Sequence, residues 1–336
     1  MARAGIREVA ERAGVSISTV SNVLNKPGRV SAPTAQRVND VMNEIGFVRN
    51  ELARQLRTGG TNMVGTVVLN VANPFFAALL HAIEASAEEA GCVAVFGSSD
   101  QLRQREERYL EVFEEQRVKG IMIAPLNGVT PTMRRLRDRG MPMVVFDASS
   151  DVDAFCSVAL DGRIGGYLAA RHLISTGRTH IAFLGGPLRQ VEDRWTGALR
   201  ACAETSGVRL SHIDTVDQTI AEGRAAGEAL QRMPAGERPD AVFAANDLLA
   251  LGLMQSLIVS GSISIPRDIA IIGYDDIDYA QSASLPLSTV RQPVDELAAT
   301  ALSLLLAEIE DGPEHVHRSV ALEPELIVRD STPPAG

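Results

Sequence analysis

Short apolar runs alternate with helix-length amphipathic segments from residue 63 onward, and this alternation limits the fold more than any other feature of the sequence. Repeated β-α-β units build parallel sheets whose faces are covered by helices. About 270 residues is generous for one such sheet and comfortable for two, so we expect an α/β body of two parallel-sheet lobes over residues 61–330, followed by a short tail, 331–336. The expected strands are Met63–Leu69, Cys92–Phe96, Gly120–Ala124, Met143–Phe146, Ser157–Leu160, Ile181–Leu184, Ala241–Ala244 and Ile269–Ile272. The expected helices are Phe76–Ala90, Leu102–Arg117, Arg163–Thr176, Thr196–Ser206, Gly223–Met233 and Leu248–Ser260.

The charge distribution separates a small N-terminal segment from this body. Residues 1–60 carry nine basic and five acidic side chains, whereas the whole chain has a net charge of −10. The rest of the chain is therefore strongly acidic. A small basic segment on an acidic body favours contact of that segment alone with the phosphates of nucleic acid.

Apolar residues at helical spacing predict three short helices in residues 1–48. The first ends at Gly14, the second has Ser16 as its N-cap, and the third begins after Ser31 with a proline in its first turn. The second helix leaves a small, polar face outward, as a helix that enters a major groove requires. These features together predict a helix-turn-helix. The expected buried positions are Ile6, Val9, Ala10, Ala13, Val20, Val23, Leu24, Val38, Val41, Met42 and Ile45.

Two stretches of this segment resemble the head and hinge of the LacI/GalR family of transcriptional repressors. They are IREVAERAGVSISTVSNVLNKPGRVS, residues 6–31, and GFVRNELARQLRTG, residues 46–59. The resemblance implies a repressor that binds a pseudo-palindromic double-stranded DNA operator as a homodimer. It places Ile17, Ser18 and Asn22 at base-reading positions. It places Ser16, Thr19, Ser21, Asn25 and Thr34 beside the phosphate backbone.

The base-reading positions depart from many relatives, which carry arginine or another long polar side chain there. Asn22 can pair with the N6 and N7 atoms of adenine, whereas Ile17 can only contact a thymine methyl group or fill space. The operator of a relative therefore does not transfer to this chain. An alternative for Asn22 is a solvated helix residue without a reading role.

Residues 49–60 are expected to form a hinge helix and linker. The helical segment is too short to be stable alone in water, which suits a switch. The resemblance implies that this hinge orders in the minor groove, with Leu56 as a wedge between central base pairs and Ala53 in close groove contact. Arg54 and Arg57 would then lie near phosphates. An ordinary i,i+4 core pair of Leu52 with Leu56 is the alternative.

The body resembles the family's effector domain, in which two flavodoxin-like lobes, similar to periplasmic sugar-binding proteins, are joined by three crossovers. Open parallel sheets bind ligands beyond the carboxyl ends of their strands. The resemblance implies effector contacts there, and a carboxylate set with an arginine and an aromatic ring suits a mono- or oligosaccharide. The implied contacts are Phe75, Asp147, Arg194, Asn246 or Asp247, and Asp275.

Each of these side chains also has a structural alternative. Asp247 could cap the helix that begins at Leu248, Asp275 could cap a turn, and Phe75 with Phe76 could belong to the core. Gln218 stands where some sugar-responsive relatives have an aromatic wall, so we do not expect flat stacking on that side.

Other functions find little support in the sequence. No nucleotide-binding, hydrolase or zinc-protease motif is present, so we expect neither an enzyme nor a cofactor. We expect His315 and His317 to lie in a solvated loop or strand edge rather than in a metal site. Three dispersed cysteines and an N-terminus without a secretory signal predict a cytoplasmic protein that does not enter membranes. A periplasmic solute-binding protein remains the alternative for the body.

Overall fold

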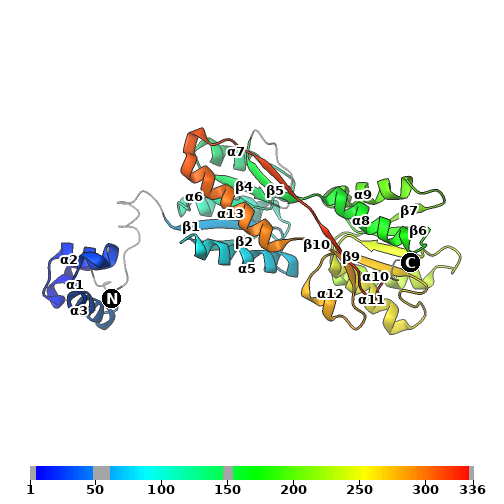
Figure 1. The fold of residues 1–336 in the computed structure, drawn as a ribbon, viewed down its shortest axis with the longest axis horizontal. Helices are drawn as coiled ribbons and strands as arrows, with labels where there is room; N and C mark the ends of the chain where they lie inside the picture. The colour runs from blue at the N-terminus through cyan, green and yellow to red at the C-terminus, as the bar shows by residue number, and fades with distance from the viewer. Residues whose placement is uncertain (1–4, 48–60, 147–153, 333–336) are drawn as a thin grey trace. The chain divides into compact units, whose positions relative to one another are not determined.

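The computed structural model describes residues 5–47, 61–146 and 154–332. The chain divides into two compact units, Met1–Thr61 and Asn62–Gly336 (Figure 1). Among the described residues, no helix combines the length and the apolar character that a membrane span needs.

The N-terminal unit is a bundle of three short helices. They are α1 (Ile6–Ala13), α2 (Ile17–Asn25) and α3 (Ala32–Glu44), with a 3₁₀ turn, η1 (Pro27–Arg29), before α3. Gly14 ends α1 in the left-handed conformation, with φ of 63°, as the sequence predicts. Each predicted apolar position lies in this core or packs against it, which confirms the predicted face of each helix. The buried members are Val9, Ala10, Ala13, Val20, Val23 and Val38.

The first lobe of the C-terminal unit is a parallel sheet with the order β11-β5-β4-β3-β1-β2. Its five consecutive strands have the flavodoxin-like order 2-1-3-4-5. The strands are β1 (Met63–Val68), β2 (Val93–Ser98), β3 (Ile121–Ile123), β4 (Met143–Phe146), β5 (Cys156–Leu160) and β11 (Ser319–Leu322). The helices are α5 (Pro74–Glu89), α6 (Arg103–Glu115), α7 (Pro131–Asp138) and α13 (Val294–Asp311).

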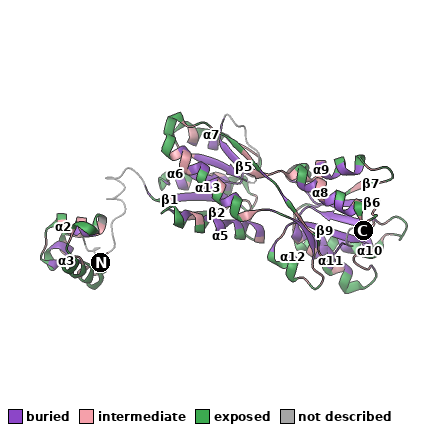
Figure 2. Ribbon diagram, viewed as in Figure 1, coloured by how far each residue is buried: buried purple, intermediate pink, exposed green. Residues whose placement is uncertain are grey.

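This lobe has one hydrophobic core on each face of its sheet. Successive side chains of a strand point to opposite faces, so alternating residues of a strand belong to different cores. Met122 and Val144 pack with α5 and α13 on one face. Ile121, Ile123 and Val145 pack with α6 and α7 on the other. Helices therefore cover both faces, and Figure 2 shows the central strands as a buried layer between them.

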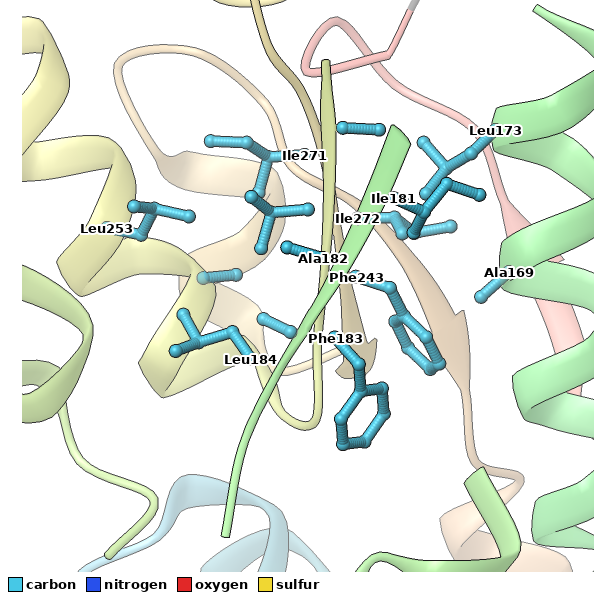
Figure 3. Packing of buried hydrophobic residues seen from close by; sticks show 14 of the residues in the cluster. Ala169, Leu173, Ile181, Ala182, Phe183, Leu184, Phe243, Leu253, Ile271 and Ile272 are labelled. Atoms are coloured by element: carbon cyan, nitrogen blue, oxygen red, sulfur yellow. The ribbon is translucent and has the colours of Figure 1, made fainter. Parts of the chain in front are cut away.

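The second lobe repeats the same arrangement, with the order β12-β10-β9-β8-β6-β7 and only β12 antiparallel to its neighbour among the described pairings. Side chains of α8 and α11 approach opposite sides of its strands (Figure 3). The strands are β6 (His180–Leu184), β7 (Arg209–Ile213), β8 (Ala241–Ala244), β9 (Ala270–Asp275), β10 (Ser288–Arg291) and β12 (Glu325–Ile327). The helices are α8 (Gly162–Ser175), α9 (Glu192–Ala203), α10 (Ile220–Arg232), α11 (Asp247–Ser260) and α12 (Asp278–Ser282), with a 3₁₀ turn η2 (Leu188–Gln190).

The chain passes between the lobes three times. It leaves the first lobe after β5, returns to it between β10 and α13, and crosses again in the short connection from β11 to β12 (Figure 1). The predicted two lobes with three crossovers are therefore confirmed.

Several elements are missing from the sequence-based prediction. The strands β7, β10, β11 and β12 and the helices α7, α12 and α13 are absent from it, although α13 spans 18 residues. The predicted tail begins too early, because Ser331 and Thr332 are buried. The Ser331 hydroxyl donates to the carbonyl oxygen of Ile271 and accepts from the backbone N–H of Ser288, which fixes this segment against the second lobe.

Candidate functional site

The N-terminus of α2 is shaped by Ser16. Its hydroxyl accepts a hydrogen bond from the backbone N–H of Thr19 at 3.1 Å, which satisfies one of the orphan amides of the first turn. The Ser16 hydroxyl also lies 2.7 Å from that of Ser18 and 2.8 Å from that of Thr19. Three hydroxyls therefore gather at a helix N-terminus, where the helix dipole and backbone amides favour an anion such as phosphate.

The outward face of α2 presents small side chains. Ile17 is 45% exposed and Ser18 is exposed, whereas Ser21 and Asn22 are half-buried along the same helix. Asn25 ends α2. A helix with one protruding apolar residue and several short polar ones can enter a major groove without steric obstruction.

The start of α3 supplies a second helix N-terminus on the head. Ser31 is its N-cap residue, and its hydroxyl lies 2.9 Å from that of Thr34. The predicted serine cap therefore makes no hydrogen bond to a backbone amide, and the two hydroxyls pair with each other instead. The predicted hinge residues Ala53, Arg54, Leu56 and Arg57 lie outside the described residues.

A cavity of about 370 Å³ lies at the carboxyl ends of the strands of the C-terminal unit, with walls from both lobes. This is the edge at which open parallel sheets bind ligands. Four of the six predicted effector residues line it, namely Phe75, Arg194, Asn246 and Asp275. Asp147 lies outside the described residues. The other lining residues are Leu69, Asn70, Ala72, Asn73, Phe76, Gln101, Gln190, Asp217, Gln218, Thr219, Ile220, Ala221, Leu248 and Gln292.

Arg194 is the cation of the cavity wall. It lies in the first turn of α9, and its guanidinium carbon is 3.9 Å from the centroid of the Tyr274 ring. One guanidinium nitrogen also donates to the carbonyl oxygen of Ala245, at the end of β8. A stacked and hydrogen-bonded guanidinium is held in one orientation, and its remaining donors are ready for a ligand.

Asp275 is one of two acids that line the described cavity wall, the other being Asp217. It ends β9 and is only 6% exposed, and its carboxylate accepts a hydrogen bond of 2.7 Å from the Gln292 amide. Burial raises the pKa of Asp275 to about 6, and the charge of Arg194 and the hydrogen bond from Gln292 oppose this rise. Its φ of 112°, followed by 56° at Asp276, is a strained conformation for residues other than glycine, and such strain gathers at binding sites.

Asp247 has a different role from the predicted ligand contact. It does not line the cavity and is fully buried, where it accepts hydrogen bonds from the Thr289 hydroxyl at 2.7 Å and the Ile277 backbone N–H at 3.0 Å. Burial and the neighbouring Asp275 raise its pKa well above the usual range. Asp247 therefore fixes the loop after β9, and of the two predicted alternatives only Asn246 faces the cavity.

Asn246 also corrects the predicted helix cap. It is the N-cap of α11, because its side-chain oxygen accepts a hydrogen bond from the Leu249 backbone N–H at 2.9 Å. Its amide nitrogen donates to the carbonyl oxygen of Gln218 at 3.2 Å. The capping role considered for Asp247 thus belongs to its neighbour, and Asn246 joins two segments of the cavity wall.

The wall from the first lobe is neutral among the described residues. Phe75 is 3% exposed and packs edge-on against Phe76, with ring centroids 5.0 Å apart. Both belong to the core of the lobe and also line the cavity, so the two interpretations of Phe75 coexist. Asn73 caps α5 through the Phe75 backbone N–H and also hydrogen-bonds Asp275 of the other lobe.

A set of amides across the cavity escaped the sequence-based prediction. The Gln101 amide donates to Asp217 at 3.0 Å, and the Gln190 amide donates to the Gln101 side-chain oxygen at 3.2 Å, so these contacts connect the lobes. Gln292 follows β10, a strand that the sequence-based prediction missed. Because ligands bind beyond strand ends, a prediction of β10 would have identified Gln292 as a candidate.

His315 departs from the expected solvated position. Its side chain is 5% exposed, and its two ring nitrogens lie 3.2 Å from the Cys156 sulfur and 2.9 Å from an Asp311 oxygen. The ring of His317 packs edge-on against it, with centroids 5.4 Å apart. The two histidines therefore belong to a side-chain cluster of the first lobe.

Both units of the chain match known protein families. Residues 5–50 match the family described as bacterial regulatory proteins, lacI family, and residues 170–332 match the periplasmic binding protein-like domain. The chain is 32% identical to the HTH-type transcriptional repressor PurR of Aliivibrio fischeri, over 98% of both chains.

Solved structures extend this similarity to three dimensions. The lac repressor dimer bound to operator and the anti-inducer ONPF is similar with a TM-score of 0.84 and 26% identity, over 98% of this chain and 99% of that one. A LacI family transcriptional regulator from Enterococcus faecium with bound ribose has a TM-score of 0.73 and 30% identity, over 82% of this chain and 100% of that one.

Proposed function

The chain belongs to the lacI family of bacterial regulatory proteins and is a DNA-binding transcriptional repressor with an effector-binding domain, and we propose that it acts as a homodimer on a pseudo-palindromic operator. The observation that carries this proposal is the small, exposed N-terminal face of α2 on a three-helix head, in one chain with a cavity that polar, charged and apolar side chains line. Two-fold operators match two-fold protein symmetry, so a dimer would place one α2 in each half-site.

We propose that Ile17, Ser18 and Asn22 read bases and that the hydroxyls at the starts of α2 and α3 position the phosphates. The exposure of Ile17 and Ser18 supports this assignment. The proposed backbone contacts are Ser16, Thr19, Ser21, Asn25 and Thr34. In the hinge, Leu56 would wedge between base pairs, Ala53 would contact the groove, and Arg54 with Arg57 would lie near phosphates.

Selection of bound sequences from random duplex DNA tests the reading assignment. We expect Asn22→Ala to relax base preference at one position of each half-site, since a good bidentate base contact contributes about 1–3 kcal/mol. Asn39→Ala is the control, because Asn39 is an exposed asparagine of α3. An unchanged base preference in Asn22→Ala would remove Asn22 from the readers.

A second variant tests the hinge. We expect Leu56→Ala to lower specific operator affinity while the C-terminal unit unfolds at the same denaturant concentration as wild type. Operator affinity equal to wild type would contradict the wedge assignment.

We propose that the effector is a mono- or oligosaccharide held by Arg194 and Asp275, with Phe75 and Asn246 in the wall. A fixed guanidinium, a carboxylate and several amides can hold neighbouring hydroxyl groups through charge-assisted hydrogen bonds. The bound ribose of the Enterococcus faecium regulator supports a sugar in this type of cavity. The undescribed Asp147 would complete the set.

Binding of the effector and binding of the operator would be coupled, because each would favour one of two states of the protein. A ligand can change operator affinity only by its different affinities for the two states. We propose that this regulator is not an enzyme and acts in the cytoplasm, where its DNA is present.

A thermal-shift screen of sugars against the full chain, with each hit retested for its effect on operator affinity, tests the effector assignment. At ligand concentrations of 100 times Kd, stabilisation of about 2.7 kcal/mol is expected. A screen without hits would count against a sugar. Failure to bind genomic operator fragments, with or without ligand, would favour the solute-binding alternative.

A further inference from the structure

The pairing of β5 with β11 brings a thiol and two imidazoles together at the amino ends of the first-lobe strands. Cys156 is the first residue of β5, and His315 and His317 lie just before β11, whose Ser319 is in register with Ser157. One ligand atom from each of the three side chains lies within 4.8 Å of the other two. This cluster is at the opposite end of the strands from the effector cavity.

Asp311 sets the tautomer of His315. Its carboxylate oxygen lies 2.9 Å from Nδ1, and a carboxylate can only accept, so Nδ1 carries the proton. The lone pair of Nε2 therefore faces the Cys156 sulfur at 3.2 Å. A carboxylate behind an imidazole that orients the other nitrogen is the usual second shell of a metal-binding histidine.

His317 contributes a ring nitrogen that has nothing to bind. Its Nδ1 is buried and has no hydrogen-bond partner among the described residues. Buried polar atoms are rarely left without a partner, so the unpartnered Nδ1 indicates that a ligand binds here.

The environment of Cys156 argues against a reactive thiol. Its side chain is fully buried, and buried cysteines of this kind are inert rather than nucleophilic. The backbone N–H of Arg318 nevertheless points at the sulfur from 3.4 Å, a contact that stabilises a thiolate once a cation has displaced the proton.

We propose that Cys156, His315 and His317 bind a transition-metal cation of the zinc type. One thiolate and two imidazoles are the donors that Zn²⁺ prefers, and a water molecule would occupy the fourth tetrahedral position. The metal displaces the Cys156 proton to solvent, forms one bond to sulfur and two to nitrogen, and changes no oxidation state. Asp311 supplies compensating negative charge behind His315.

The surface offers a route to the cluster. An open pocket of about 520 Å³ is lined by His315 together with Asp311 and Glu314, whose carboxylates attract a hydrated cation. Binding would join β5 to the connection between α13 and β11. The proposed metal site lies apart from the effector cavity. It would let the repressor bind a metal ion in addition to its effector.

Cobalt titration of the metal-stripped full chain tests the proposal, because Co²⁺ bound to thiolate gives a charge-transfer absorption. We expect one Co²⁺ per chain, displaced by Zn²⁺. Cys156→Ser should abolish the absorption, and Cys202→Ser, which alters another buried thiol, should retain it.

Two further variants, one of a histidine and one of an aspartate, keep the test decisive if Cys156→Ser fails to fold. His317→Gln should weaken Zn²⁺ binding by at least about 100-fold, and Asp311→Asn by about 10–100-fold. His81→Gln is the control, since His81 is exposed on α5. Absence of the absorption in wild type, or Zn²⁺ affinities of His317→Gln and His81→Gln that agree, would overturn the proposal.

Discussion

The two lobes of the C-terminal unit share one strand order, yet their helices pack differently. In the second lobe, glycines let helix backbones touch: a Cβ on Gly166 would lie 2.0 Å from the Arg194 carbonyl oxygen, and one on Gly223 would lie 2.1 Å from that of Leu249. In the first lobe, Gly97 lies on strand β2, and a Cβ there would meet the side-chain ring of Tyr109 on α6 instead of a backbone. One topology thus supports both rigid helix pairs and more adaptable contacts.

The lobes also differ in the charges that they present to the shared cavity. The second lobe supplies Arg194, Asp217 and Asp275, with Asp247 buried behind the wall, whereas the described wall of the first lobe is made of amide, aromatic and aliphatic side chains. The rigid helix pair α8 and α9 carries Arg194. The helix that carries Arg194 is thus held by a backbone contact, which suits preorganised recognition.

The largest effect should come from breaking the helix contact of the second lobe. Gly166→Ala places a methyl group against a backbone oxygen that cannot rotate away, so we expect a loss of about 3 kcal/mol or more in the free energy of unfolding. Urea denaturation measures it. Gly236→Ala, in the same lobe with nothing within 4 Å of the new methyl group, should change little.

Gly97→Ala makes the matching change in the first lobe. Its clash is with a half-buried tyrosine ring, which can move, so the loss should be smaller than for Gly166→Ala. Equal losses for the two variants would contradict the difference in packing between the lobes.

These close contacts of glycines with other helices could not be predicted from the sequence. Periodicity predicted the alternation of strands and helices, because it follows from local burial. It did not show that Gly166 faces Arg194, because two helices meet only in the folded lobe. β7 was missed because its residues alternate between exposed and half-buried positions at a sheet edge, without an apolar run.

The candidate site was predictable to a similar extent. The rule of strand ends located Phe75, Arg194, Asn246 and Asp275 at the cavity. It could not separate Asn246 from Asp247, because neighbours at a helix start point in different directions that depend on the cap. The cluster at Cys156 was missed because it depends on the pairing of β5 with β11.

The second prediction concerns pH, because each lobe buries one acid with a pKa raised to about 6, Asp275 in the second and Glu308 in the first. An acid with a higher pKa in the folded state binds its proton more tightly there. The free energy of unfolding therefore falls as pH rises from about 4 to 6, by about 3 kcal/mol for Asp275 and about 2 kcal/mol for Glu308.

Urea denaturation of Asp275→Asn and Glu308→Gln across this pH range measures the two contributions. Each variant should gain stability relative to wild type as pH rises, and the gain should be larger for Asp275→Asn. A difference from wild type that does not vary with pH would show that the acid is not titrating in this range.

The third prediction compares two buried acids that hold loops. Asp247→Ala removes the acceptor of the Thr289 O–H and of the Ile277 N–H, and we expect a loss of about 2 kcal/mol in the free energy of unfolding. Glu106→Ala in the first lobe frees only the Leu126 N–H, so about 1 kcal/mol is expected. A larger loss for Glu106→Ala would reverse the comparison.

The smallest effect concerns the asparagine caps, Asn73 on α5 in the first lobe and Asn246 on α11 in the second. Replacing either by alanine should lower the free energy of unfolding by about 1 kcal/mol. Asn73 differs because it also donates to Asp275 across the cavity. Asn73→Asp keeps a capping oxygen but cannot donate, and it brings a second carboxylate toward Asp275. If Asn73→Asp is as stable as wild type, Asn73 contributes through capping alone. If Asn73→Asp loses as much stability as Asn73→Ala and the pKa of Asp275 rises further, Asn73 of the first lobe also influences the ionisation of Asp275 in the second lobe.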